Sequence, residues 1–216
     1  FLFLTDLREE TGNSHITIGT IVTDKKGNLW IASSTGLFKY ENNILTKITQ
    51  TEEEIKHLTF YDKNHLFYIT STGISLLDIS TSKSRLIYPN DTKDFRQIAS
   101  LYYDEQLNRL WIGTGAAGLF YYDIIKKTLS PIPLKGFPKQ PILAIKKDIN
   151  NTLLIGIDGQ GIWNISEKGD KLLNIYKEDL NNPFSLRGDG VYDIFCDKSR
   201  NWVATYTGKL SFFENV

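Results

Sequence analysis

The chain has 216 residues, and its 25 Lys and Arg residues balance its 25 Asp and Glu residues, so the formal charge at neutral pH is zero. This balance, without any basic tract, argues against a protein that binds nucleic acid or a membrane surface. The single cysteine, Cys196, excludes an intramolecular disulfide, and its apolar neighbours predict a buried, unreactive thiol.

The N-terminal residues Phe1 to Thr5 read as one short apolar strand. They are too few, and lack the basic leader, for an intact signal peptide. Because the chain begins with Phe and contains no methionine, we expect it to be a processed product or a piece of a longer protein.

The next segment predicts four consecutive strands, at 18–23, 29–33, 36–40 and 44–48. Its residues are rich in Ile, Val, Thr, Phe and Trp, which favour strands. The connection at 24–28 reads Asp-Lys-Lys-Gly-Asn, in which Asp can bond its own backbone and Gly or Asn can adopt a positive φ. This unit therefore predicts a four-stranded antiparallel sheet.

The same pattern, an Asp turn followed by a Trp-centred strand and a Gly turn, occurs five times along the chain. The central residues are Trp30, Phe67, Trp111, Leu154 and Trp202, separated by 37, 44, 43 and 48 residues. A period in this range is typical of a four-stranded propeller blade. The motif residues that we expect to build the blades are Asp24, Trp30, Gly36, Asp104, Trp111, Gly118, Gly161, Asp197, Trp202 and Gly208.

The sequence thus predicts an all-β fold, a β-propeller of four-stranded antiparallel blades that occupies residues 1–216 as a single domain or propeller fragment. The large side chain of each central strand should fill the wedge between blades. We expect the strand at 1–5 to complete the last blade. Five blades closing alone, or an arc of a larger propeller, both fit the repeats. The expected blades span 18–50, 55–90, 97–134, 141–177 and 190–216.

The segments Thr23–Ala32 and Leu110–Thr114 resemble the two-component regulator propeller repeat, as does the blade-linking segment Asn182–Leu186. The resemblance implies the extracytoplasmic, periplasmic sensor region of a Bacteroides-type hybrid two-component regulator. Such regions usually have seven blades, are linked to oligosaccharide sensing and often form homodimers. Their histidine kinase, receiver and DNA-binding domains are absent from this chain, so only those absent parts would reach a membrane or nucleic acid.

Catalytic chemistry finds little support in the sequence. The histidines, His15, His57 and His65, lack the nearby Cys pair or carboxylate pattern of a metal site. No Gly-x-Ser-x-Gly nucleophile elbow is present. We therefore predict no catalytic residues, no metal and no cofactor, and expect this chain not to be an enzyme.

Ligand binding is expected in the loops at one end of the blades, because a rigid scaffold displays recognition residues on its connections. These loops combine amides, carboxylates, guanidinium groups and an aromatic ring, a mixture that suits sugar hydroxyls and the apolar face of a sugar. Arg187 and Asp189 are the first choices. The candidate ligand-binding residues are Arg96, Gln97, Gln140, Asp158, Gln160, Arg187, Asp189 and Tyr192.

The function predicted from these observations is an oligosaccharide-sensing propeller module. A propeller that serves only protein interaction or dimerisation is the main alternative. A propeller glycan lyase or hydrolase is a third, which would need positioned acid and base groups.

Overall fold

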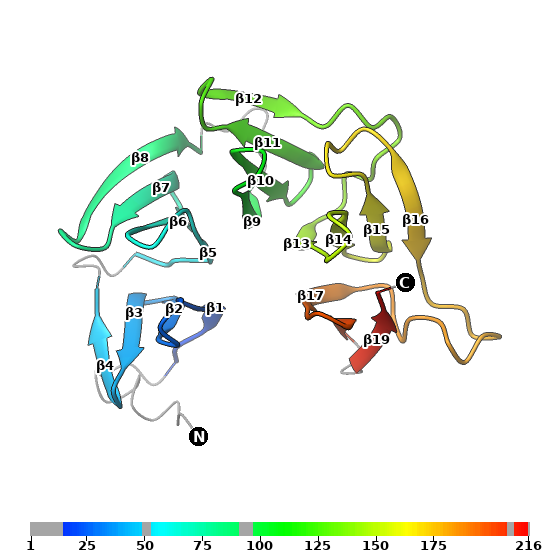
Figure 1. Cartoon of the computed structure of the whole chain (residues 1–216), viewed down its shortest axis with the longest axis horizontal. Helices are drawn as coiled ribbons and strands as arrows, with labels where there is room; N and C mark the ends of the chain where they lie inside the picture. The colour runs from blue at the N-terminus through cyan, green and yellow to red at the C-terminus, as the bar shows by residue number, and fades with distance from the viewer. Residues whose placement is uncertain (1–14, 49–52, 91–96, 207–209, 216) are drawn as a thin grey trace. The chain divides into compact units, whose positions relative to one another are not determined.

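The computed structural model describes residues 15–48, 53–90, 97–206 and 210–215. Within these ranges the regular structure is entirely β, with 19 strands in five antiparallel sheets (Figure 1). The predicted all-β fold of propeller blades is confirmed. The described ranges contain no helix with the length and apolar character that a bilayer crossing requires.

The chain divides into two compact units, Phe1–Asp91 and Thr92–Val216. The first unit holds two four-stranded sheets, here blades 1 and 2, each ordered as in the sequence. Blade 1 comprises β1 (Ile18–Thr23), β2 (Leu29–Ser33), β3 (Gly36–Glu41) and β4 (Ile44–Lys47). Blade 2 comprises β5 (His57–Phe60), β6 (His65–Thr70), β7 (Gly73–Asp78) and β8 (Lys83–Pro89).

The second unit holds blades 3, 4 and 5. Blade 3 comprises β9 (Ile98–Asp104), β10 (Arg109–Thr114), β11 (Leu119–Asp123) and β12 (Thr128–Pro131). Blade 4 comprises β13 (Ile142–Lys147), β14 (Leu153–Ile157), β15 (Gly161–Ile165) and β16 (Leu172–Tyr176). Blade 5 has three strands among the described residues, β17 (Val191–Cys196), β18 (Arg200–Thr205) and β19 (Leu210–Glu214). The predicted strand at 1–5 and the motif residue Gly208 lie outside the described residues.

The Asp turn closes the hairpin between the first two strands of a blade. In blade 1, Asp24 Oδ1 accepts the backbone N–H groups of Lys26 (2.9 Å) and Asn28 (3.0 Å). Its Oδ2 accepts the indole N–H of Trp30 at 3.3 Å. The corresponding carboxylates of the other blades also accept backbone N–H groups within their own hairpins, namely Asp62, Asp104, Asp148 and Asp197.

Neighbouring blades pack through the large residue of the central strand. Trp30 is buried against Leu58 of blade 2, and Trp111 is buried against Ile142 of blade 4. The small residue that follows the central position allows this approach. A Cβ on Gly156 would lie 2.7 Å from Val191 Cγ1 of blade 5, far inside van der Waals contact. The predicted wedge role is therefore confirmed for Trp30 and Trp111.

Blade 5 differs from this pattern on one face. Trp202 is only partly buried, and its cross-strand neighbours Phe195 and Phe212 are exposed. The opposite face of the same sheet carries Val191 and Val203, which pack into the core shared with blade 4. The expectation of a fully wedged Trp thus fails for Trp202 among the described residues.

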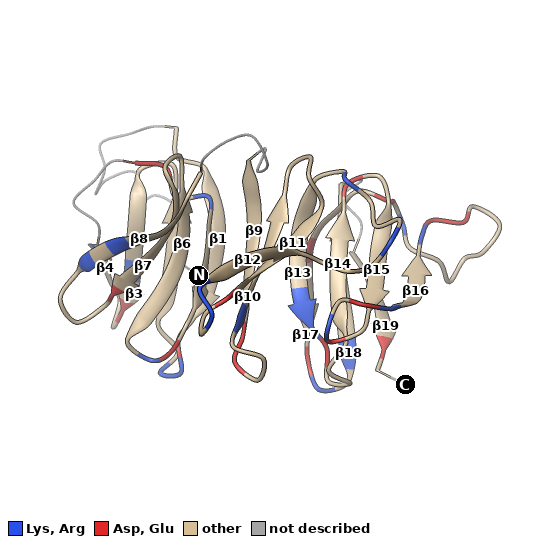
Figure 2. Ribbon diagram, turned by 90° about the horizontal axis from the view of Figure 1, so that it is seen from above, with Lys and Arg blue, Asp and Glu red and all other residues tan. Residues whose placement is uncertain are grey.

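Charged residues of both signs lie mostly at strand ends and in connections (Figure 2). This distribution follows from strands whose side chains are covered on both faces, as in β6, β10 and β14. The connections are therefore the part of the fold that can present polar chemistry to a ligand.

Candidate functional site

One end of each blade carries the turn after its second strand. In blade 4 this turn contains Asp158, whose N–H donates to the carbonyl of Pro141 at the start of β13 (2.9 Å). In blade 5 the N–H of Tyr206 donates to the carbonyl of Gly190 just before β17 (2.8 Å). Asp158 and Tyr206 therefore occupy equivalent positions in neighbouring blades. The matching pairs of blades 1 and 3 are Ser34 with Thr17 and Gly115 with Gln97.

Four residues of the second unit meet at this end, here called the tyrosine–carboxylate site: Asp158, Gly190, Tyr192 and Tyr206. A Cβ on Gly190 would lie 3.3 Å from Asp158 Oδ1 and 3.2 Å from Tyr206 Cβ. Tyr192 and Tyr206 stack with ring centroids 5.8 Å apart and planes inclined by 24°. The two residues are 52% and 75% exposed, so ring surface outside the stack remains available to a ligand.

The carboxylate of Asp158 is exposed and accepts no hydrogen bond from the described residues. An ionised carboxylate offers two acceptor oxygens and no donor. An exposed ring pair beside an uncommitted carboxylate can stack on the apolar face of a sugar while accepting hydrogen bonds from its hydroxyl groups.

Several other predicted ligand residues hold the segments around this site. Gln160 Oε1 accepts a hydrogen bond from Lys177 Nζ at 3.0 Å. Asp189 Oδ1 accepts the N–H of Glu178 at 2.7 Å, which ties the start of the β16–β17 connection to its end. Arg187 Nη2 donates to the carbonyl of Pro183 at 2.7 Å within that connection. Arg187 and Asp189 thus hold backbone groups, and Gln160 holds the Lys177 side chain. Contact of these three residues with a ligand stays a prediction.

The two remaining glutamines lie at the same ends of their blades. Gln140 is exposed and precedes Pro141, the residue that binds the Asp158 turn. Gln97 is exposed, has a φ of 56°, and accepts the N–H of Gly115 through its carbonyl at 2.7 Å. Arg96 lies outside the described residues. The structure therefore groups Asp158, Gln160, Asp189 and Tyr192, with Gln140 next to them and Gln97 one blade away.

Tyr206 is a site residue that the sequence analysis missed. Tyr206 follows β18 directly, where the repeat pattern is weakest. Its neighbours Thr205 and Thr207 are residues that favour strands, so the local sequence does not indicate a turn. Aligning the turns by the residue after each second strand would have found it, because Ser34, Gly115, Asp158 and Tyr206 are equivalent.

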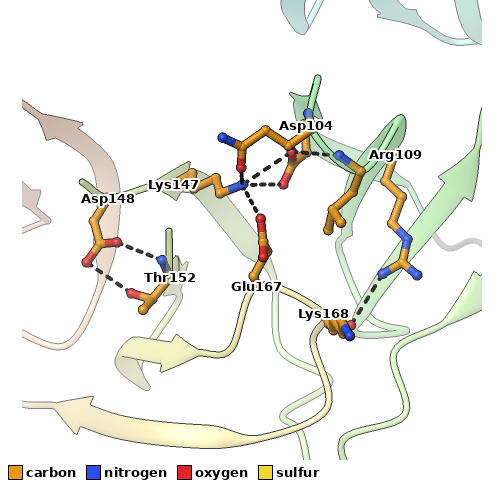
Figure 3. Close-up of polar contacts among 9 residues, drawn as sticks. Asp104, Arg109, Lys147, Asp148, Thr152, Glu167 and Lys168 are labelled. Carbon is orange, nitrogen blue, oxygen red and sulfur yellow. Dashed lines mark hydrogen bonds and ion pairs between the residues drawn. The ribbon is translucent and has the colours of Figure 1, made fainter. Parts of the chain in front are cut away.

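A second polar group of residues lies between blades 3 and 4, at the hairpin that follows β9 (Figure 3). Lys147 Nζ donates to Asp104 Oδ2 (3.1 Å), Gln106 Oε1 (2.7 Å) and Glu167 Oε1 (2.6 Å). The side chains of Lys147 and Asp104 are 8% and 1% exposed. Because three acceptors satisfy the ammonium group, this cluster is suited to joining blades rather than to chemistry on a ligand.

The connection between β15 and β16 completes this junction. Arg109 Nη1 approaches the carbonyl of Lys168 at 3.5 Å, and Arg109 also lies 4.2 Å above the ring of Tyr121. Gly169 packs on Trp111, where an added Cβ would lie 3.1 Å from the indole. Trp111 Nε1 is buried without a hydrogen-bond partner, because Asp104 is turned to Lys147.

Within the described ranges, neither the requirements of a metal site nor those of a reactive thiol are met. These ranges contain no group of three or more His, Cys, Asp or Glu residues arranged to hold a metal ion. His65 Nδ1 contacts Asp62 Oδ1 at 2.9 Å on the surface of blade 2. Burial raises the pKa of the Cys196 thiol to about 12, so this thiol is not a nucleophile at neutral pH.

No protein-family model matches the chain, and no curated protein matches it in sequence. Solved structures match it in fold. The extracellular domain of a protein described as a hybrid two-component system from B. thetaiotaomicron superposes with a TM-score of 0.68 at 20% identity, over 90% of this chain and 26% of that chain. The extracellular domain of a one-component system from the same bacterium gives 0.50 at 18% identity, over 93% of this chain and 38% of that one.

A structure of a nidogen/laminin complex gives a TM-score of 0.72 at 7% identity, over 91% of this chain and 75% of that chain. Similarity at these identities reports the fold, which is therefore shared by proteins with different roles. The chain spans only about a quarter to two fifths of the length of the B. thetaiotaomicron structures. The resemblance stated from the repeats is confirmed at the level of the fold, which this chain shares with the extracellular domain of a hybrid two-component system.

Proposed function

We propose that this chain is a non-enzymatic, extracytoplasmic sensor module of a hybrid two-component regulator, located in the periplasm, that binds an oligosaccharide. The tyrosine–carboxylate site carries the proposal, since it sets two exposed stacked rings beside an uncommitted carboxylate. The fold shared with the extracellular domains of a hybrid two-component system and of a one-component system supports the sensor role. The kinase that would receive the signal belongs to a longer parent protein.

A ligand that binds only the folded state raises the thermal midpoint, and above its dissociation constant the rise follows the logarithm of its concentration. We therefore expect one class of plant or host oligosaccharide to raise the midpoint of this chain in a thermal-shift screen. Calorimetric titration of that class gives the dissociation constant against which variants are compared.

Tyr206→Ala should weaken binding by roughly tenfold, because a lost stacking contact is worth about 1.5 kcal/mol. Phe184→Ala is the matched control, since Phe184 is also an exposed aromatic but lies on the β16–β17 connection. Arg187→Ala should also weaken binding, by loosening the segment that leads to Gly190. Unchanged affinity in Tyr206→Ala would remove the tyrosine–carboxylate site from the binding surface.

A protein-interaction or dimerisation role is a second candidate, favoured by the β16–β17 connection, which extends away from blade 4 (Figure 1). Leu180 and Phe184 on this connection are 89% and 94% exposed. The segment is nonetheless ordered, because Ser185 Oγ both accepts the N–H of Asp179 and donates to its carbonyl (2.9 Å each). A dimer that forms without glycan and is lost in Leu180→Ser/Phe184→Ser would favour this role.

A further inference from the structure

The charged groups around the tyrosine–carboxylate site differ in how far protein hydrogen bonds already occupy them. The ammonium of Lys177 is held by Gln160, and the guanidinium of Arg187 is held by the Pro183 carbonyl. The carboxylate of Asp158 accepts no hydrogen bond from the described residues. Both cations keep their charge in these bonds to neutral oxygens, but part of their donor capacity is used, whereas the Asp158 carboxylate keeps its acceptor capacity for a ligand.

The absence of a side chain at Gly190 lets this carboxylate and Tyr206 lie close together. Gly190 separates Asp158 from Tyr206, and a single Cβ at this position would contact both residues at 3.3 and 3.2 Å. The φ of Gly190 is outside the left-handed region, so alanine is compatible with the backbone there. A substitution at Gly190 therefore changes the spacing of Asp158 and Tyr206 without changing the charge of the site.

Resting on the proposed function, we propose that this site selects sugars without negative charge. The Asp158 carboxylate accepts hydrogen bonds from hydroxyl or amino groups of a sugar whose apolar face lies on Tyr206. A uronic acid in the same place brings a second carboxylate against Asp158, and like charges brought together across an interface oppose binding. Asp158 is therefore the residue that determines the charge class of the ligand.

The test is calorimetric titration of the whole chain with tetrasaccharides of glucose and of galactose, each as the neutral sugar and as the matching uronic acid. For whichever sugar, glucose or galactose, forms the tetrasaccharide that binds, the uronic acid form should bind at least about tenfold more weakly than the neutral form. Asp158→Asn keeps one acceptor but removes the charge, and should bring the two affinities to within about threefold of one another.

Two further variants separate this explanation from others. Gly190→Ala should weaken binding of the neutral sugar by at least about tenfold, because the added methyl group forces Asp158 and Tyr206 apart. Lys139→Gln should leave the preference unchanged; Lys139 is the exposed lysine two residues before Pro141. The thermal midpoint of each variant without ligand reports folding.

Each result has a defined meaning. A uronic acid that binds as well as the neutral sugar, or a preference that persists in Asp158→Asn, overturns the selectivity and leaves the sensor function intact. Failure of every tetrasaccharide to bind overturns the proposed function together with the selectivity. If Gly190→Ala leaves the affinity for the neutral tetrasaccharide unchanged, the ligand binds elsewhere and the selectivity proposed for this site is wrong.

Discussion

The aspartate that opens each hairpin gathers several donors on one carboxylate. Asp197 accepts the backbone N–H groups of Ser199 and Arg200 at 2.7 Å each and the indole N–H of Trp202 at 3.0 Å. The hydrogen bond from Trp202, followed by those from the backbone, holds the pKa of Asp197 far below its ordinary range. The ionised form therefore stabilises this turn.

This lowered pKa predicts how stability depends on pH. A carboxyl group whose pKa is lower in the folded state stabilises the protein fully above its unfolded pKa of about 4, and the stabilisation is lost as pH falls toward the folded pKa. The thermal midpoint should thus fall between about pH 5 and pH 2, and less steeply in Asp197→Asn. Differential scanning fluorimetry across this range measures both slopes. Glu105→Gln, at an exposed residue of the β9–β10 hairpin, should retain the wild-type slope.

At the scale of elements, blade 3 uses its aspartate differently. Asp104 keeps its bonds to the hairpin but directs its remaining capacity to Lys147 of β13 instead of to Trp111. The hairpin of blade 3 is consequently joined to the first strand of blade 4, and Glu167 extends the junction to the β15–β16 connection. An ammonium that is 8% exposed is stable there because all of its donors are used.

Removing the ammonium should therefore be costly. Lys147→Met leaves Asp104 buried without its counter-ion, and should lower the free energy of unfolding by about 3–5 kcal/mol. Adding Asp104→Asn to this variant should recover part of the loss, because a neutral amide is cheaper to bury than an unpaired carboxylate. Urea denaturation of the single and double variants measures the coupling. A double variant that is no more stable than Lys147→Met would show that the ion pair is not what stabilises the junction.

At the scale of the whole molecule, stability should follow the position of a strand within its blade. The central strands β6, β10 and β14 are almost wholly buried and pair on both edges, whereas β8 and β16 form edges and are largely exposed. Amide hydrogen exchange should therefore be slowest in the central strands and fastest in β4, β8, β12 and β16. Mass spectrometry of exchanged peptides measures this order, and equal protection of β14 and β16 would contradict it.

The fold could be predicted from the sequence because five copies of one unit repeat its strand and turn chemistry. Blade 1 shows this most clearly, with strands within one residue of the expected bounds at both ends. A repeat averages out weak copies, so the loss of Trp at Phe67 and Leu154 did not obscure the pattern. The half-buried state of Trp202 was not predictable, because the motif identifies a large apolar side chain but not the neighbouring residues that would pack against it.

The candidate site was only partly accessible to sequence reasoning. Polar residues in loops, such as Asp158 and Tyr192, could be nominated by type and position. The bonds that engage Arg187 and Asp189 depend on how the β16–β17 connection folds back on itself, which has no counterpart in the repeat. The proximity of Tyr206 to Asp158 depends on the spacing of neighbouring blades, and this spacing is set by core residues such as Gly156 and Val191.

The distribution of tryptophan gives the protein a set of built-in optical probes. Trp30, Trp111, Trp163 and Trp202 lie in blades 1, 3, 4 and 5, and blade 2 has Phe67 at its central position. The indoles of Trp30 and Trp111 are shielded from water, whereas that of Trp202 is partly hydrated, so their emission should differ in colour. Variants that keep a single tryptophan could therefore report the unfolding of one blade at a time by fluorescence. Blade 2 contains no tryptophan and would give no such signal.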